Sequence, residues 1–212
     1  MKIVTLLAQK GGTGKTTLSI HLAVLATARG MRVVIADIDP QRSAGVWKKR
    51  REEDNPDVIS LKADVLEKAI GDYKKQGVDL LVIDTAPHSH DDAIIAARAA
   101  DFILIPSRPA ILDLEAIGTS VDIVKGLAGK AAIVLNGCPF PGKSGERAIV
   151  VEAREALGGY GLPVSPAAIS NRVALSHSLI GGQAVTEFES DGKAAAEIRE
   201  LMNWINEEVG LW

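Results

Sequence analysis

Short apolar runs alternate with longer segments of helical periodicity along nearly the whole chain. The short runs are bounded by polar residues and predict buried strands at residues 3–8, 32–37, 57–61, 80–84, 101–106 and 131–136. The segments between and after them predict helices at residues 18–28, 41–53, 64–76, 93–100, 112–127, 147–157 and 192–209. This alternation predicts one α/β domain over residues 1–212, with helices on both faces of a mostly parallel, doubly wound sheet.

Residues 9–17 connect the first strand to the first helix and read Gln-Lys-Gly-Gly-Thr-Gly-Lys-Thr-Thr. A glycine-rich loop in this position binds phosphates, because glycines let successive N–H groups point inward. The helix that opens at Lys15 adds its positive dipole end, Lys15 adds a mobile cation, and the hydroxyl of Thr16 is placed to bind magnesium. The expected nucleotide-binding residues are Gly11, Gly12, Thr13, Gly14, Lys15, Thr16 and Thr17.

The composition indicates a substantial aliphatic core, since 47% of the 212 residues are apolar and only 4% are aromatic. The net charge of −3 argues against a basic coat, so any nucleic acid would be held by a local patch or by an oligomer. A single cysteine, Cys138, allows no internal disulfide and suits a reducing cytoplasm. The sequence has no signal peptide and no apolar run long enough for a bilayer, so we expect a cytoplasmic protein with no membrane partner.

Three further patterns are interpreted as structural. Residues 137–144 match the usual phosphate-loop pattern, but Pro139 and Pro141 lack the N–H groups that a phosphate cradle needs. Residues 88–92 contain two histidines and two aspartates, and we interpret them as a loop that caps the next helix rather than as a zinc site. The basic run at residues 48–51 is followed at once by acidic residues, which predicts a solvated helix face.

The loop departs from the usual phosphate-loop pattern at Gln9, where a glycine is usual, and it carries an additional lysine, Lys10. The form Lys-Gly-Gly-x-Gly-Lys-Thr resembles the ParA/MinD family of deviant P-loop ATPases, and the chain is most similar to the small, ParF-like DNA partition ATPases. The resemblance implies a P-loop fold, ATP and Mg²⁺ as cofactors, and Mg-dependent hydrolysis of ATP to ADP and phosphate. Because the first strand begins at Lys2, we expect no N-terminal helix-turn-helix domain.

Two predicted strands end in acids, at the edge of a parallel sheet where ligands bind. Residues 37–41, Asp-Ile-Asp-Pro-Gln, match the Asp-x-Asp-Pro-Gln sequence of the ParA group. The resemblance implies that Asp39 orients the attacking water and that Asp37 supports the magnesium shell. The apolar run at residues 81–83 leads to Asp84, which resembles the Walker B acid that holds magnesium through water. A plain Asp-Pro turn is the structural alternative for the first pair of acids.

Lys10 and Asn136 receive their roles from the same resemblance. In the family, the lysine equivalent to Lys10 reaches across a dimer interface to the phosphates of the partner's ATP, which implies a homodimer when ATP is bound. Asn136 ends a strand, and its amide suits the edge of adenine, as at the same position in the family. Residues 106–115 resemble the segment that contributes to the dimer face. The structural alternatives are a solvated lysine and a turn at Asn136-Gly137.

The C-terminal third resembles the closing blocks of small ParA proteins, whose basic residues form a non-specific DNA surface on the dimer. The candidates for DNA contact are Arg172, Lys193 and Arg199, with Arg147 and Arg154 behind them. A patch that dimerisation doubles predicts binding that weakens steeply with salt. The resemblance also implies a nucleoid-associated protein that segregates or positions a plasmid, a chromosome or another cargo. A ParB-like or analogous adaptor protein would stimulate its ATP hydrolysis.

Proteins with this loop have several functions, and fold alone does not choose among them. A MinD-like membrane cycler needs a basic amphipathic tail, whereas glutamates dominate the last predicted helix. A reductase like the nitrogenase iron protein needs paired cysteines, and a bacterial tyrosine autokinase needs a tyrosine-rich tail; this sequence has neither. An ATP-dependent ligase or amidase related to dethiobiotin synthetase remains the alternative, and it would need a pocket for a small acid beside the γ-phosphate.

Overall fold

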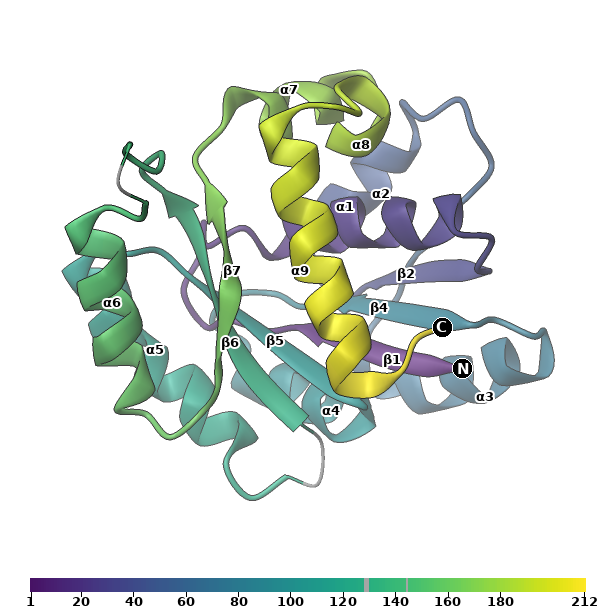
Figure 1. Cartoon of the computed structure of the whole chain (residues 1–212). Helices are drawn as coiled ribbons and strands as arrows, with labels where there is room; N and C mark the ends of the chain where they lie inside the picture. Colours follow the sequence, from purple (N-terminus) through teal and green to yellow (C-terminus); the bar gives the residue numbers. More distant parts are fainter. Residues whose placement is uncertain (128–129, 144) are drawn as a thin grey trace.

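The computed structural model describes residues 1–127, 130–143 and 145–212, which form a layered α/β structure (Figure 1). The described strands form one sheet in the order β3-β2-β4-β1-β5-β6-β7, and each pairing is parallel. The strands are β1 Lys2–Leu6, β2 Val33–Asp37, β3 Asp57–Ser60, β4 Leu80–Asp84, β5 Phe102–Ser107, β6 Lys130–Cys138 and β7 Val164–Ser170. The helices are α1 Lys15–Ala28, α2 Ser43–Lys48, α3 Leu66–Lys75, α4 His90–Ala99, α5 Ile111–Val124, α6 Ala148–Gly158, α7 Val173–Ile180, α8 Val185–Phe188 and α9 Lys193–Val209. The predicted doubly wound, parallel architecture is confirmed.

Helices cover both faces of the sheet because the strands are apolar on both sides. α1, α7, α8 and α9 lie on one face, and α3, α4, α5 and α6 lie on the other (Figure 1). Alternate residues of one strand serve the two layers, so Val4 and Leu6 pack with α1 and α9 while Ile3 packs with the opposite helices. Within the described residues, no helix has both the length and the apolarity to span a bilayer.

The later part of the sheet differs most from the prediction, because the apolar pattern does not predict β7, α7 or α8. β7 carries Pro166 at an exposed position of an edge strand, where a missing N–H is tolerated, and the β6–β7 register shifts around it. The helix predicted at residues 41–53 is wrong in length, because α2 ends at Lys48. The helix predicted at residues 64–76 begins with a 3₁₀ turn, η1, Ala63–Val65.

Arg51 connects the residues that follow α2 to α8 and to the turn after α7, so the prediction of a solvated helix face is wrong at this residue. Its side chain is only 2% exposed and donates two hydrogen bonds to Glu187, at 2.7 and 2.9 Å. A third bond, of 3.1 Å, reaches the carbonyl of Gly182, and the guanidinium lies 5.2 Å from the ring centroid of Trp47. Burial by itself raises the pKa of Glu187, but the bonds from Arg51 and from the Ala184 N–H lower it overall.

Gly182 allows the turn after α7 to pack closely against the residues that follow α2, a contact that we call the joint. Its φ of +73° disfavours any residue with a side chain, and a Cβ at this position would lie 2.4 Å from the carbonyl carbon and oxygen of Arg50. The turn after α7 therefore packs directly on the backbone at the end of α2.

His21 connects α1 to α7 and α8 from inside the core. Its ring is fully buried, with Nε2 3.1 Å from the carbonyl of Leu175 and Nδ1 accepting a hydrogen bond of 3.2 Å from the N–H of Val185. Because Nδ1 accepts, Nε2 carries the proton and donates to Leu175. Burial lowers the pKa of His21 to about 4, against the opposing effects of the Leu175 carbonyl and of Glu187. The imidazole is therefore neutral at neutral pH.

Candidate nucleotide-binding site

The predicted phosphate loop lies at the carboxyl end of β1 and leads into α1. Gly12 and Gly14 adopt φ values of +72° and +99°, so the curled backbone depends on glycine at both positions. Asn136 of β6 holds the loop from the side, because its Nδ2 donates a hydrogen bond of 2.6 Å to the carbonyl of Thr13. A Cβ on Gly14 would lie 2.1 Å from the same nitrogen. The cradle thus depends on its own glycines and on a neighbouring strand.

Lys15 is buried beneath the loop, and its Nζ donates a hydrogen bond of 3.4 Å to the carbonyl of Lys10. Burial lowers the pKa of Lys15, against the opposing charges of Asp84 and Asp39. A cavity of about 250 Å³ opens beside it, which we call the phosphate cavity. Its lining residues are Gly11, Gly12, Gly14, Lys15, Thr16, Thr17, Asp39, Ser43 and Pro87. The structure therefore gathers most of the predicted phosphate-binding residues around one opening.

Asp84 ends β4 and is the direct strand partner of Asp37 in β2. It is fully buried, and its Oδ1 accepts a hydrogen bond of 3.3 Å from Ser19, while Oδ2 has no partner among the described residues. Burial raises the pKa of Asp84 to about 7, and the Thr16 hydroxyl and Lys15 oppose this. A buried carboxylate oxygen without a partner and a threonine hydroxyl are hard oxygen ligands, the kind that Mg²⁺ prefers. Asp84 and Thr16 therefore fit a magnesium ion.

Asp37 and Asp39 lie in different environments. The carboxylate of Asp37 accepts backbone hydrogen bonds of 3.2 Å from Asp39 and 3.1 Å from Gly45, so it anchors the start of α2. Burial raises the pKa of Asp37, and these backbone bonds oppose the rise. Asp39 is more exposed and lines the phosphate cavity, with its Oδ1 accepting a bond of 2.9 Å from the N–H of Gln41. Asp39 is thus the acid that faces the cavity, whereas Asp37 organises the backbone around it.

A second cavity, of about 440 Å³, continues from the phosphate cavity, because Gly12, Gly14 and Thr17 line both. Its other lining residues come from the ends of β5, β6 and β7 and from α7, and they are Arg108, Asn136, Gly137, Ser170, Asn171, Arg172, Leu175 and Ser176. We call it the nucleoside cavity. The two cavities together form a groove that suits a phosphate chain at one end and a nucleoside at the other, with Asn136 at the nucleoside end.

Lys10 lines neither of these cavities. Its ammonium lies 3.1 Å from the carboxylate of Asp113 in the first turn of α5, and its side chain remains 35% exposed. Ile111 and Leu112, in the same turn, are each 68% exposed. A cation and two exposed apolar side chains therefore lie together beside the groove.

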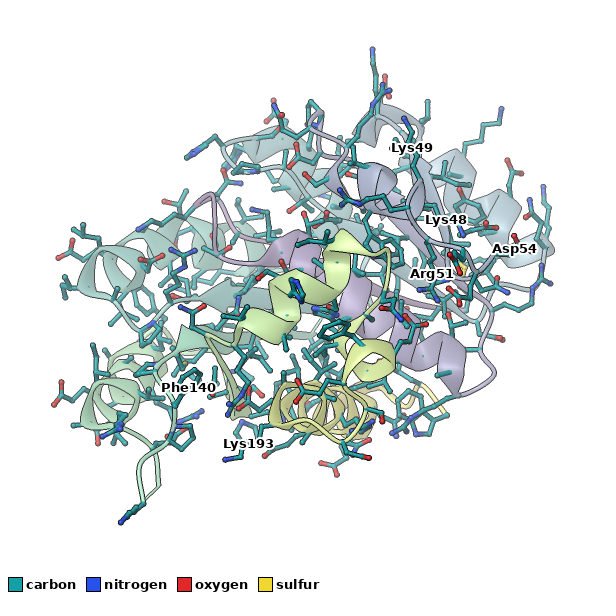
Figure 2. All side chains as sticks on the ribbon, turned by 90° about the horizontal axis from the view of Figure 1, so that it is seen from above. Lys48, Lys49, Arg51, Asp54, Phe140 and Lys193 are labelled. Atoms are coloured by element: carbon teal, nitrogen blue, oxygen red, sulfur yellow. The ribbon has the colours of Figure 1, made fainter. Side chains whose placement is uncertain are left out.

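The residues predicted to contact DNA lie around α9. Lys193 is exposed in the first turn of that helix, and Arg199 is partly buried further along it. Arg172 packs against α9, because its guanidinium is 2.8 Å from the carboxylate of Glu197 and its side chain is 18% exposed. In the view of Figure 2, Lys193 and Lys49 lie well apart, with α7 between them. The charge of Arg172 is thus matched within the chain, and Lys193 is the exposed one of these three residues around α9.

Sequence reasoning does not single out Ser19, Arg108 or Asp113. Ser19 follows Lys15 by one helical turn, and that spacing is the signal that could have placed its hydroxyl on the same side of α1. Arg108 and Asp113 fall within residues 106–115, but nothing in the sequence shows what their side chains meet. Their contacts depend on the turn between β5 and α5.

A parallel sheet, a glycine cradle, a buried lysine and a strand-end acid define a P-loop nucleotide-binding protein. The sequence profile of the CobQ/CobB/MinD/ParA nucleotide binding domain matches residues 4–185. The chain belongs to this family, and it is an ATPase of the ParA/MinD type with a deviant phosphate loop.

The chain is similar to known proteins both in sequence and in fold. It is 31% identical to the maintenance of carboxysome distribution protein A of Gloeobacter kilaueensis, over 98% of this chain and 94% of that protein. It is 30% identical to the chromosome partitioning protein ParA of Caulobacter vibrioides, over 52% of this chain and 49% of that protein. Its structure is similar to apo McdA of Cyanothece, with a TM-score of 0.79 at 17% identity, over 96% of this chain and 98% of the other.

His21 and Asp84 predict opposite pH dependences of stability in the nucleotide-free protein. The pKa of His21 is lowered from 6.5 to about 4, so its contribution is complete above pH 6.5 and is lost as the pH falls toward 4. The pKa of Asp84 is raised from 3.8 to about 7, so its contribution is complete below pH 3.8 and is lost as the pH rises toward 7. The full shifts correspond to about 3 kcal/mol of stability for His21 and about 4 kcal/mol for Asp84. Between about pH 4 and pH 6.5, where both groups contribute, the two opposite effects on stability nearly cancel.

Single substitutions should separate the two slopes. Between pH 6.5 and 4, the unfolding free energy of Asp84→Asn relative to the wild type should fall by about 3 kcal/mol, and that of His21→Gln should rise by about 3 kcal/mol. Urea unfolding at several pH values without nucleotide measures both. Variants that keep the wild-type pH profile would show that neither group titrates as described.

Proposed function

We propose that this chain is a ParA-type positioning ATPase, in which two ATP-bound protomers pair face to face and the pair binds DNA without sequence preference. The position of Lys10 carries the proposal. It lies outside the groove of its own chain, paired with Asp113 and beside the exposed Ile111 and Leu112. A partly exposed cation and exposed apolar side chains next to a nucleotide groove suit a dimer face that forms only when ATP supplies phosphates.

The residues of the groove supply the parts of an ATPase cycle. Lys15 and the N–H groups of the loop hold the β- and γ-phosphates, and Thr16 and Asp84 would hold Mg²⁺, which would neutralise negative charge on the phosphates. Asp39 orients the attacking water from the open side of the phosphate cavity. Loss of the γ-phosphate removes a ligand of the partner's Lys10, so hydrolysis separates the two protomers.

The names of the relatives support a positioning role. One is a maintenance of carboxysome distribution protein and another a chromosome partitioning protein. We infer that this chain likewise positions a large cargo, either DNA or a protein assembly, along the nucleoid. A ParB-like or analogous adaptor on the cargo stimulates ATP hydrolysis and so releases the ATPase from DNA.

DNA contact in this proposal is made around the start of α9. Lys193 and Arg199 belong to this surface, while Arg172 is balanced by Glu197 and contributes less charge. One protomer therefore presents a modest positive patch, and pairing of two protomers strengthens binding by doubling it.

The test is binding to an arbitrary DNA duplex at fixed moderate salt with ATP, with ADP and without nucleotide. We expect binding only with ATP, and Lys193→Ala should weaken it and reduce the salt slope by about one counterion per protomer. Lys75→Ala is the matched control, because the Lys75 side chain is 82% exposed on α3, across the sheet from α9. Failure to bind DNA in every state, with ATP binding confirmed, would favour the ligase or amidase and direct the search to small acids.

A further inference from the structure

Arg108 lies across the opening of the nucleoside cavity. It follows β5, and its stem runs along Gly137, since a Cβ at Gly137 would lie 3.7 to 4.0 Å from Cγ, Nε and Cδ of Arg108. The far end of the side chain reaches the phosphate loop, where Nη2 lies 3.6 Å from the position of a Cβ on Gly12. The side chain therefore bridges the end of β6 and the loop that cradles phosphates.

The two arginines of the nucleoside cavity differ in how their charge is matched. Arg172 pairs with Glu197 at 2.8 Å. Across residues 1–127, 130–143 and 145–212, no carboxylate forms an ion pair with Arg108, and Arg108 is exposed. An unpaired guanidinium beside a phosphate cradle suits a phosphate, because its planar fork can donate to two oxygens at once.

The place of Arg108 along the groove indicates which phosphates it meets. Gly12 and Gly14 line both cavities, so the phosphates nearest the ribose pass over this part of the loop. Lys15 approaches the loop from its buried side, and Arg108 approaches Gly12 from the exposed side. A nucleotide in the groove is therefore held between two cations.

We propose that Arg108 is a nucleotide-binding residue that holds the α- and β-phosphates of the nucleotide bound in its own chain. ATP and ADP share these phosphates, so Arg108 strengthens the binding of both. It acts equally on the ground state and the transition state, and it therefore affects affinity rather than the chemical step. The inference rests on the nucleotide site of the proposed function, and Lys15→Ala, which should abolish nucleotide binding, tests that site separately.

The experiment measures Kd for ATP and ADP, and kcat at saturating ATP, in the wild type, Arg108→Ala and Arg108→Lys. Arg108→Ala should weaken both nucleotides about tenfold and leave kcat within about twofold, with Arg108→Lys between it and the wild type. The Kd values of Arg108→Ala should also depend less on salt than those of the wild type, because one charge contact is lost. Arg98→Ala is the matched control, since Arg98 is an exposed arginine of α4 that lines a different cavity, and its replacement should leave both Kd values unchanged.

Three results would overturn the assignment. Kd values of Arg108→Ala that stay within about twofold of the wild type would show that Arg108 does not contact the nucleotide. A loss of affinity confined to ATP would show that the guanidinium contacts the γ-phosphate instead. A loss that disappears in a Lys10→Ala background would assign Arg108 to the nucleotide of the partner. An unchanged thermal unfolding temperature of nucleotide-free Arg108→Ala shows that a lost contact, and not lost folding, is measured.

Discussion

Asp39→Ala should bind ATP with near wild-type affinity and hydrolyse it at least about 100-fold more slowly. Asp39 lines the open side of the phosphate cavity and bonds to the N–H of Gln41, so the buried Lys15 and the loop should keep their positions without it. With ATP held and the attacking water unoriented, the variant should accumulate as an ATP-bound dimer. Single-turnover phosphate release, together with the nucleotide content and mass of the isolated dimer, measures these effects.

Asp122→Ala is the matched control for this prediction. The side chain of Asp122 is 75% exposed on α5 and lies 3.8 Å from Lys125, outside the groove, so its replacement should leave hydrolysis unchanged. Hydrolysis at the normal rate by Asp39→Ala would mean that another group orients the water. Loss of ATP binding by Asp39→Ala would mean that this carboxylate holds the nucleotide itself.

Gly182→Ala should lower the free energy of unfolding by about 3 kcal/mol or more. The φ of Gly182 is +73°, and an added Cβ would meet the backbone of Arg50 and Arg51 at 2.4 to 2.5 Å. Backbone atoms at the end of a helix cannot move aside as a flexible side chain can, so the turn after α7 must lift away from α2. The bonds from Arg51 to Glu187 depend on this close approach and should weaken with it. Urea unfolding monitored by tryptophan fluorescence measures the loss, since Trp47 lies in the joint.

Gly30→Ala is the control that distinguishes the steric clash at Gly182 from the strain of a positive φ. Gly30 has a φ of +85° but no atom within 4 Å of an added Cβ, so its replacement should cost only about 1 kcal/mol. Equal losses in the two variants would show that strain alone acts at Gly182 and that the joint with α2 tolerates a methyl group.

The central strands could be predicted because they are buried on both faces and are therefore apolar at nearly every position. Every residue of β2, β4 and β5 is buried, so each strand appears in the sequence as a nearly continuous apolar run. β7 is an edge strand with an irregular burial pattern and a proline, and its pairing depends on β6 rather than on its own composition. Its sequence therefore lacks the pattern by which the other strands were predicted.

The same distinction applies to the site. The phosphate loop is contiguous in sequence, so its residue types and spacing predict its chemistry. Arg51 meets Glu187 across 136 positions, and a local run of basic residues does not reveal a partner that folding brings from so far away. Arg108 likewise acquires its neighbours Gly12 and Gly137 only when β5 and β6 pair beside β1.

In the proposed dimer, Lys10 must leave Asp113 before it can reach the phosphates of a partner. Pairing of two protomers therefore exchanges one ion pair for another and releases few counterions, so ionic strength should act only weakly on this step. The proposed association with DNA should respond differently, because each phosphate contact displaces condensed counterions and weakens steeply with salt. A rise in ionic strength would then detach ATP-bound dimers from DNA while leaving the two protomers paired. ATP hydrolysis, by contrast, would separate the protomers and release the DNA together.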